Sequence, residues 1–228
     1  MSVYGETHVP HHARRSRLPE IEPHDDIGTI SEARLAIEEC RRCPLYQYAT
    51  QAVFGEGPQR AAIMFVGEQP GDQEDVQGKP FVGPAGRIFD KALDRVGIDR
   101  RRTYVTNAVK HFKFTQRGKR RLHQRPNAGE VAACRFWLNL EREFVKPKVV
   151  VAMGTTAIQS LLGRAASITS LRGKPIELDD GSILYVTIHP SYLLRIRGDD
   201  EASFRAQERA FEADLKKIRA LAGERMDA

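Results

Sequence analysis

Three polar stretches of the sequence carry the residues best suited to chemistry. The first is the loop-like stretch Gly67-Glu-Gln-Pro-Gly-Asp-Gln-Glu-Asp75, in which Glu68 and Gln69 stand where a glycine and a proline bend the chain. The second covers residues 107–125, and the third is His189-Pro-Ser191. Carboxylate, amide and imidazole groups orient substrates and hold or move protons. Each stretch alone is as typical of a solvated turn, so the prediction of a site depends on their meeting in space.

The second stretch is strongly basic. Between Lys110 and Arg125 seven residues are Lys or Arg and none is acidic, and Phe112, Phe114 and His123 lie among them. Clustered cations neutralise phosphates, and aromatic rings stack on unpaired bases. A run of charge alone is more typical of a solvated loop, but its position after a predicted strand favours nucleic-acid binding.

The cysteines indicate a metal centre. Cys40 and Cys43 form a C-x-x-C pair, and Cys134 lies far along the chain. Three thiols are one ligand short of a zinc site or an iron–sulfur cluster, and His111 is the best placed fourth ligand. Two buried thiols and one free thiol are the alternative that the spacing leaves open.

Strand and helix patterns alternate along most of the chain. Continuous apolar runs predict four strands, at 61–66, 103–109, 148–153 and 183–188. Apolar periodicity and capping residues predict helices after Ser31 and at 85–96, 129–145, 155–162 and 204–222. This alternation predicts an α/β fold, a three-layer αβα sandwich around a central four-stranded parallel sheet. Since ligands bind at the carboxyl edge of such sheets, the three polar stretches are expected to meet there.

The composition excludes some classes of protein. With 228 residues of which 41% are hydrophobic, the chain is long and apolar enough to bury a core, so it is not wholly disordered. No apolar run approaches the roughly 18–20 residues of a membrane helix. The net charge of +6 permits binding to a polyanion without proving it.

The first thirty residues differ from the rest. They hold four of the seven histidines and little apolar periodicity, which predicts a flexible arm over 1–30 and one domain over 31–228. The N-terminus lacks the apolar core of a secretory signal, so a reducing cytoplasmic setting is expected.

Together these residues resemble the uracil-DNA glycosylase superfamily, in particular its iron–sulfur branch. The matching segments occur in the family's order over roughly residues 35–220 and are Cys40-Arg-Arg-Cys43-Pro-Leu, Gly67-Glu-Gln-Pro-Gly71, Gly78-Lys-Pro-Phe-Val-Gly-Pro-Ala-Gly86, Tyr104-Val-Thr-Asn107, Ala133-Cys134-Arg and His189-Pro-Ser191. Three departures from the ordinary pattern are similar to the UdgX subgroup, which excises uracil and stays attached to the abasic DNA. They are His111 in place of a cysteine, Gln69 in place of an alanine, and the basic insertion 119–125.

The resemblance implies a role for each motif. His123 would be the residue that attaches to C1′ of the abasic sugar. The ligands of a [4Fe–4S] cluster would be Cys40, Cys43, His111 and Cys134. The other catalytic residues would be Glu68, Gln69 and His189, and the substrate-binding residues Gly67, Asp72, Asp75, Phe81, Asn107 and Arg121.

The side chains suit those roles. His189 offers a hydrogen bond to uracil O2, the Asn107 amide pairs with O4 and N3–H, and Phe81 stacks on the flipped base. If Glu68 takes the proton from the His123 imidazole after attack on C1′, the adduct becomes a neutral N-glycoside and a poor leaving group. Gln69, Asp72, Asp75 and Arg121 are expected to shape or hold the loop.

The expected partners are uracil-containing DNA, with single strands preferred over double strands, and uracil itself. A monomer in the bacterial cytoplasm, associated with the nucleoid and not with a membrane, is expected, and the cluster is expected to be structural. Three alternatives remain: an ordinary multiple-turnover uracil glycosylase, a non-catalytic binder of damaged DNA, and a zinc-bearing nucleic-acid module.

Overall fold

A computed structural model describes residues 27–198 and 200–223. The arm expected over residues 1–30 lies largely outside the described residues and stays a prediction there. The helix that opens the described chain begins at Ile30, with Thr29 as its N-cap. Among the described residues, none of the helices combines the length and apolarity needed to cross a bilayer.

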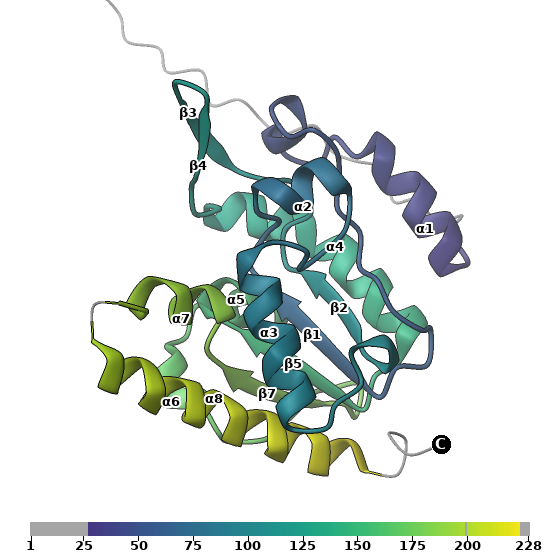
Figure 1. The fold of residues 1–228 in the computed structure, drawn as a ribbon. Helices are drawn as coiled ribbons and strands as arrows, with labels where there is room; N and C mark the ends of the chain where they lie inside the picture. The colour runs from purple at the N-terminus through teal and green to yellow at the C-terminus, as the bar shows by residue number, and fades with distance from the viewer. Residues whose placement is uncertain (1–26, 199, 224–228) are drawn as a thin grey trace, which may run out of the picture.

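The sheet confirms the predicted α/β class. Its strands lie in the order β2-β1-β5-β7-β6, and the first four run parallel (Figure 1). Their bounds are β1 Ile63–Gly67, β2 Tyr104–Asn107, β5 Val149–Met153, β7 Ile183–Thr187 and β6 Ile176–Glu177. The two-residue β6, which pairs antiparallel with β7, was not predicted. The edge strand β6 thus adds a fifth strand to the predicted four-stranded parallel core.

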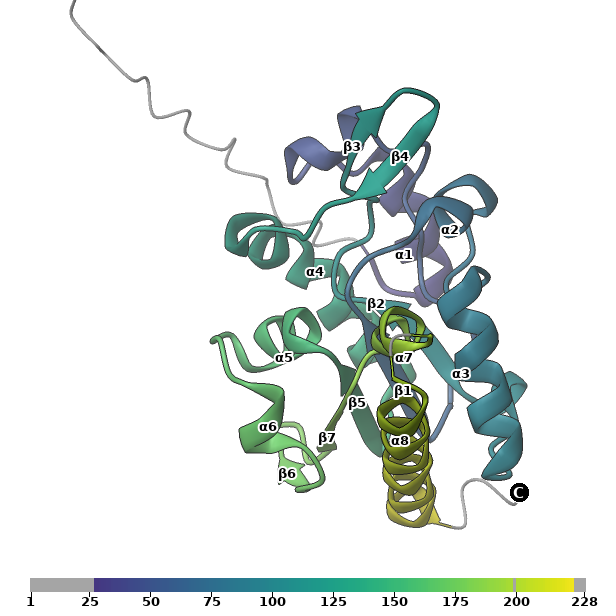
Figure 2. The same cartoon turned by 60° about the vertical axis from the view of Figure 1, so that its left-hand side comes forward.

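Helices cover both faces of the sheet, as the three-layer prediction requires. One face packs against α1 Ile30–Ala36, α4 Ala128–Val145 and α5 Thr155–Leu162, and the other against α3 Pro84–Arg95, α7 Pro190–Ile196 and α8 Glu201–Ala222. Figure 2 shows α4 and α5 on the side of the sheet opposite α3 and α8. Alternate strand residues point to the two layers, so Met64 and Val66 pack with α4 while Phe65 packs with α3.

Several short elements were not predicted. They are α2 Asp72–Gln77, α6 Ile168–Leu171, α7 Pro190–Ile196 and the short 3₁₀ turns η1 Ile37–Glu39, η2 Pro44–Gln47 and η3 Arg100–Arg102. Within the basic stretch, the bounds of the antiparallel pair β3 Phe114–Arg117 and β4 Arg120–His123 were not predicted either. The predicted cap of α1 was wrong. Thr29, not Ser31, accepts the N–H of Glu32, and the Glu32 carboxylate accepts the N–H of Thr29, which forms a reciprocal capping box.

Candidate active site and nucleic-acid interface

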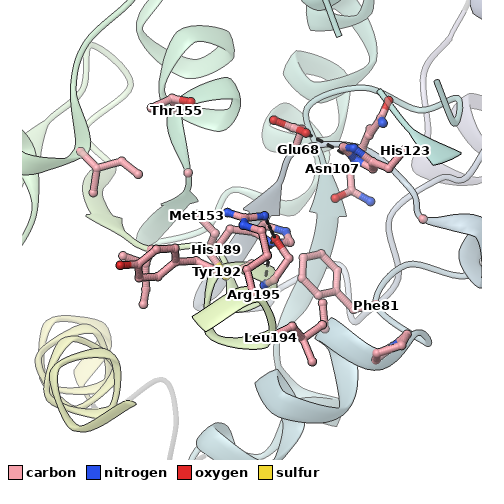
Figure 3. Close-up of a pocket in the computed structure, with 18 of the residues that line it drawn as sticks. Glu68, Phe81, Asn107, His123, Met153, Thr155, His189, Tyr192, Leu194 and Arg195 are labelled. Carbon is pink, nitrogen blue, oxygen red and sulfur yellow. Dashed lines mark hydrogen bonds and ion pairs between the residues drawn. The ribbon is translucent and has the colours of Figure 1, made fainter. Parts of the chain in front are cut away.

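A cleft of about 1330 Å³ opens at the carboxyl edge of the sheet, and all three polar stretches reach it. The sequence-predicted residues that line it are Glu68, Gln69, Asp72, Phe81, Asn107, His123 and His189. Figure 3 shows Glu68, Asn107 and His123 close together on one side of the cleft, with Phe81 below them. The three polar stretches therefore meet at the carboxyl edge of the sheet, as the strand-end rule predicts.

Glu68 is the centre of one hydrogen-bonded group. Its Oε1 lies 3.4 Å from Nε2 of His123, and its Oε2 accepts a hydrogen bond of 2.5 Å from the Thr156 hydroxyl. The side chain of His123 is 50% exposed, so its ring can meet a ligand in the cleft while it contacts the carboxylate. This arrangement suits a carboxylate that orients an imidazole and takes its proton.

The hairpin formed by β3 and β4 carries His123, and Gln69 holds the base of that hairpin. The Gln69 Nε2 donates to the carbonyls of Lys113 at 3.2 Å and Gln124 at 2.9 Å, while its Oε1 accepts from the N–H of Lys113 at 3.0 Å. Lys113 and Gln124 flank the two strands. Gln69 therefore fixes both ends of the hairpin, although it touches neither Glu68 nor His123 through any of these bonds.

Arg121 ties the same hairpin to α2. Its Nε donates to Asp72 at 2.6 Å and its Nη1 to Asp75 at 2.5 Å, and its guanidinium lies 5.4 Å from the centre of the Phe112 ring and 5.1 Å from that of Phe114. Asp75 is fully buried and does not line the cleft. Asp75 of α2 and Arg121 of the hairpin thus do not line the cleft, whereas Asp72 at the start of α2 does.

Asn107 and Phe81 lie next to this group in the cleft. Asn107 ends β2 in register with Gly67, and a Cβ on Gly67 would overlap both Asn107 and Phe81. Phe81 has a φ of 58°, in the left-handed region, and its carbonyl packs so closely on Gly86 that a Cβ there would overlap it. Gly67 therefore permits the close approach of the amide and the ring without itself presenting a polar side chain.

His189 is held as a neutral donor. It is the N-cap of α7, and its Nδ1 accepts the N–H of Ser191 at 3.1 Å. Burial, together with the charges of Arg195 and His123, lowers the pKa of His189 to about 4. Because Nδ1 accepts a hydrogen bond, the proton of the neutral ring is on Nε2, which is free to donate to a ligand.

The four predicted metal ligands are all buried: Cys40, Cys43, His111 and Cys134. Two of the sulfurs accept N–H groups, Cys40 from the Trp137 indole at 3.1 Å and Cys134 from the Lys110 backbone at 3.2 Å. Burial, with smaller contributions from the sulfurs of Cys43 and Cys40, raises the pKa of Cys134 to about 12, so the thiols are within electrostatic reach of one another.

His111 completes this donor set chemically. Burial lowers the pKa of His111 to about 4, so the ring is neutral, and its buried Nδ1 has no hydrogen-bond partner among the described residues. An unpaired buried nitrogen is costly unless it serves as a ligand or meets water. Within the described ranges, however, no three His, Cys, Asp or Glu side chains lie close enough together to ligate one metal ion.

Sequence reasoning missed Thr156, Thr155 and the residues around α6. Thr156 holds Glu68, and Thr155 lines the cleft and accepts a hydrogen bond from Arg125 at 2.8 Å. Both follow β5, so the strand-end rule would have found them had it been applied to the third predicted strand as well as to the others. The group around α6 follows no strand end, and its sequence gave no comparable signal.

Comparisons with known proteins agree with this geometry. A family model described as the uracil DNA glycosylase superfamily matches residues 54–216. The chain is 40% identical over 165 residues to the type-4 uracil-DNA glycosylase of Thermotoga maritima, and the matched region covers 72% of this chain and 82% of that protein. It is 34% identical over 204 residues to the type-4 enzyme of Sulfurisphaera tokodaii, and the matched region covers 86% of each chain. The type-4 enzyme of Pyrobaculum aerophilum is 36% identical over 173 residues, with 72% of this chain and 85% of that protein covered.

Proposed function

The chain belongs to the uracil-DNA glycosylase superfamily, and on that premise we propose that it excises uracil from single- and double-stranded DNA and stays joined to the abasic sugar through His123. One observation carries the covalent part of the proposal. The His123 ring lies 3.4 Å from the Glu68 carboxylate, in the same cleft as Asn107 and His189. An imidazole beside a proton acceptor, in reach of a sugar, is the arrangement that nucleophilic capture needs.

Excision depends on His189, Asn107 and Phe81, which line the same cleft. When the C1′–N1 bond breaks, positive charge gathers on the sugar and the electron pair leaves with the base. The neutral His189 donates to the developing charge on uracil O2, a contribution of about 2.7–4 kcal/mol for a single well-placed donor. The Asn107 amide pairs with O4 and N3–H, so the amino group of cytosine would leave it unpaired, and Phe81 stacks on the base.

Capture of the sugar follows. The lone pair of one imidazole nitrogen of His123 forms a bond to C1′, and the proton on the other ring nitrogen passes to Glu68. That proton then neutralises the uracil anion, so charge balances and the product is a neutral N-glycoside. Glu68 remains fixed throughout by its hydrogen bond from Thr156. From the neutral N-glycoside the group that would have to leave is an imidazolate anion, which leaves poorly, so the adduct is a dead end and the enzyme turns over once.

The buried donor set supports a bound [4Fe–4S] cluster. Three thiols, two of which accept N–H groups, and the unpaired nitrogen of His111 are the donors that would hold it. The ligands of a polynuclear cluster are separated by the width of the cluster, so the lack of a single-ion site among the described residues does not oppose it. Such a group supplies a cross-link between the segment before β1 and α4. His111 itself stands three residues before the hairpin, which makes the cluster an anchor for the loop.

A denaturing gel tests the covalent proposal. The full-length protein is incubated with a labelled single-stranded oligonucleotide that contains one uracil, with a thymine oligonucleotide as control. We expect a heat-stable shifted band with uracil alone, and a sugar-bearing peptide spanning residue 123 by mass spectrometry. His123→Ala is expected to lose the band and to release uracil through attack by water.

Two other outcomes decide between the candidates. Free abasic product without a shifted band, over many turnovers, would establish the ordinary hydrolytic glycosylase that the names of the relatives favour. If the protein neither excises uracil nor forms a shifted band, the DNA-binding module is the remaining candidate.

The colour of the purified protein tests the cluster. The protein is expected to be brown with broad visible absorption, and a colourless protein that holds zinc after growth with ample iron would overturn the cluster.

A further inference from the structure

The cleft extends well beyond the residues used above. A second compartment, here called the α6 lobe, is lined by Ile168, Thr169, Arg172, Tyr192, Gln207 and Asp214. Figure 3 shows Tyr192 pointing to the side of His189 that faces away from Phe81 and Glu68. At about 1330 Å³ the whole cleft is larger than one base and its sugar require, since a pocket for a drug-sized ligand spans about 300–1,000 Å³.

The floor of the α6 lobe is a partly buried ion pair with one donor left over, and the side chains of Arg172 and Asp214 are 22% and 9% exposed. Arg172 Nε donates to Asp214 at 2.8 Å and its Nη1 donates to Gln207 at 3.2 Å. Asp214 also accepts from the hydroxyls of Thr187 at 2.7 Å and Tyr185 at 3.3 Å. The Nη2 of Arg172 is buried and has no hydrogen-bond partner within the described part of the chain. A donor left unpaired in this way is expected to meet an acceptor on a ligand.

The walls and the charge of the α6 lobe select the class of ligand. Tyr192 and Ile168 present an aromatic ring and an aliphatic side chain, both packed against the core beneath them. Apolar walls with a donor at one edge suit a flat ring that carries acceptors, such as a nucleobase. A phosphate fits less well, because Asp214 already balances the charge of Arg172 and leaves the floor without net positive charge.

We propose that the α6 lobe receives the base of the nucleotide adjacent to the uracil in the same strand, with its acceptors toward Arg172. This inference rests on the proposed function, because the position of the uracil fixes which base is adjacent. The start of α7 lies between the two compartments. His189 lines the compartment proposed for the uracil, and Tyr192, three residues later, lines the α6 lobe.

Binding to three oligonucleotides tests the α6 lobe without any need for excision. Each carries 2′-fluorodeoxyuridine, which resists cleavage of the glycosidic bond. One has guanine on both sides, because guanine presents O6 and N7 as acceptors, and the other two replace the 5′ or the 3′ guanine with a tetrahydrofuran spacer. We expect the full-length protein to bind one of the spacer oligonucleotides about tenfold more weakly than the other two.

Variants assign that loss to the α6 lobe. Arg172→Met and Tyr192→Ala are each expected to bind all three oligonucleotides with affinities that agree within about twofold. Tyr192→Ala leaves the ion pair intact, which guards against a folding defect from an unpaired Asp214. The matched control is Arg142→Met, because Arg142 pairs with Asp180 outside the cleft, and it is expected to keep the tenfold preference.

Two results would overturn the inference: equal affinity of the unchanged protein for all three oligonucleotides, or the unchanged preference in both variants. If the α6 lobe binds free guanine but not the adjacent base of the strand, the three oligonucleotides would bind equally well and added guanine would compete with them. The denaturing gel tests excision and coupling to DNA independently of this binding experiment. A protein that excises uracil and couples to DNA but ignores the neighbouring base contradicts only this inference.

Discussion

The side chain of Gln69 bonds to the backbone on both sides of the hairpin, whereas the carboxylate of Glu68 next to it contacts the side chains of His123 and Thr156. In the proposed mechanism the two neighbours would have different roles: Glu68 would take the proton of His123, and Gln69 would position the hairpin that carries His123. The sequence predicted that Gln69 holds the loop but not through which atoms. Its three bonds to Lys113 and Gln124 supply that account.

Gln69→Ala is expected to slow adduct formation about tenfold while uracil release changes by less than about threefold. Three hydrogen bonds worth about 1 kcal/mol each are lost from the base of the hairpin, but the base-binding wall is untouched. Single-turnover gels that score free uracil and shifted band separately measure both rates. Gln116→Ala is the matched control. Gln116 lies in the same hairpin, and its side chain donates one hydrogen bond, to the carbonyl of Gly118. Equal losses in both rates would contradict a positioning role.

His189 predicts a specific dependence of stability on pH. Its pKa falls from the ordinary 6.5 to about 4 in the folded protein, so the folded state disfavours the charged ring. Its contribution to the free energy of unfolding is therefore complete above pH 6.5 and is lost as the pH falls toward 4, by about 3 kcal/mol at most. His189→Asn keeps an N-cap for α7 and removes the titration. In urea unfolding, the difference in stability between pH 7.5 and 4.5 is expected to be smaller for this variant, and an unchanged difference would refute the assignment.

At the scale of elements, the core of the fold was predictable and the parts that hold the site were not. Buried strands and amphipathic helices repeat apolar residues over many positions, and that repetition is what a pattern detects. The helix α2 is six residues long, starts after Pro70-Gly71 and is polar, so it was taken for a loop. Its three acidic residues in the first turn are favourable at a helix N-terminus and are the signal that was overlooked.

The two strands of the hairpin were not predicted, for a similar reason. Its strands are four residues each and contain mostly charged or polar side chains, so no apolar alternation marks them. Gly118, with a φ of 59° at the turn, is the only local sign of a hairpin in that stretch. What stabilises the hairpin is tertiary. Gln69 at its base and the two carboxylates that bind Arg121 lie far away in sequence, and no local pattern records them.

A buried ion pair links the loop after β2 to α4. Lys110 Nζ lies 2.5 Å from Glu141 Oε2, and neither side chain is exposed. Glu141 also accepts hydrogen bonds from the Gly55 N–H and the Thr106 hydroxyl. This group fixes the residue that precedes His111, and hence the path of the chain from Asn107 to the hairpin.

Lys110→Met is expected to lower the free energy of unfolding by about 3–5 kcal/mol, because it leaves Glu141 as an uncompensated buried charge. The double variant Lys110→Met/Glu141→Gln is expected to recover at least half of that loss. Arg95→Met is the control, since Arg95 pairs with Glu208 and Glu212 while 51% exposed, and should cost less than about 1 kcal/mol. Urea unfolding measures all three. A double variant no more stable than the single one would show that charge is not the cause.

At the scale of the whole molecule, the fold concentrates a modest charge. The net charge of +6 is too small to identify a partner, but Arg117, Lys119 and Arg120 are exposed on the hairpin and make no ion pair with other described residues. Figure 1 shows this hairpin extending away from the sheet, on the same side of the molecule as α2. A strand of DNA that reaches His123 must pass beside these cations. The position of these cations on the hairpin therefore matters more for DNA binding than the net charge of the chain, which does not reveal where the charges lie.

This placement predicts the salt dependence of DNA binding. Changing Arg117, Lys119 and Arg120 together to Gln is expected to reduce the slope of log K against log salt by about 2, since each phosphate contact on a single strand contributes about 0.7. The control changes Arg209, Lys216 and Lys217 to Gln, which removes the same charge from exposed positions of α8 outside the cleft. That control is expected to leave the slope within about 0.5 of the original value, because charge far from the strand releases no counterions. Fluorescence anisotropy with a labelled 2′-fluorodeoxyuridine oligonucleotide at several salt concentrations measures both. An equal fall in the two variants would mean that net charge, and not the hairpin, attracts the DNA.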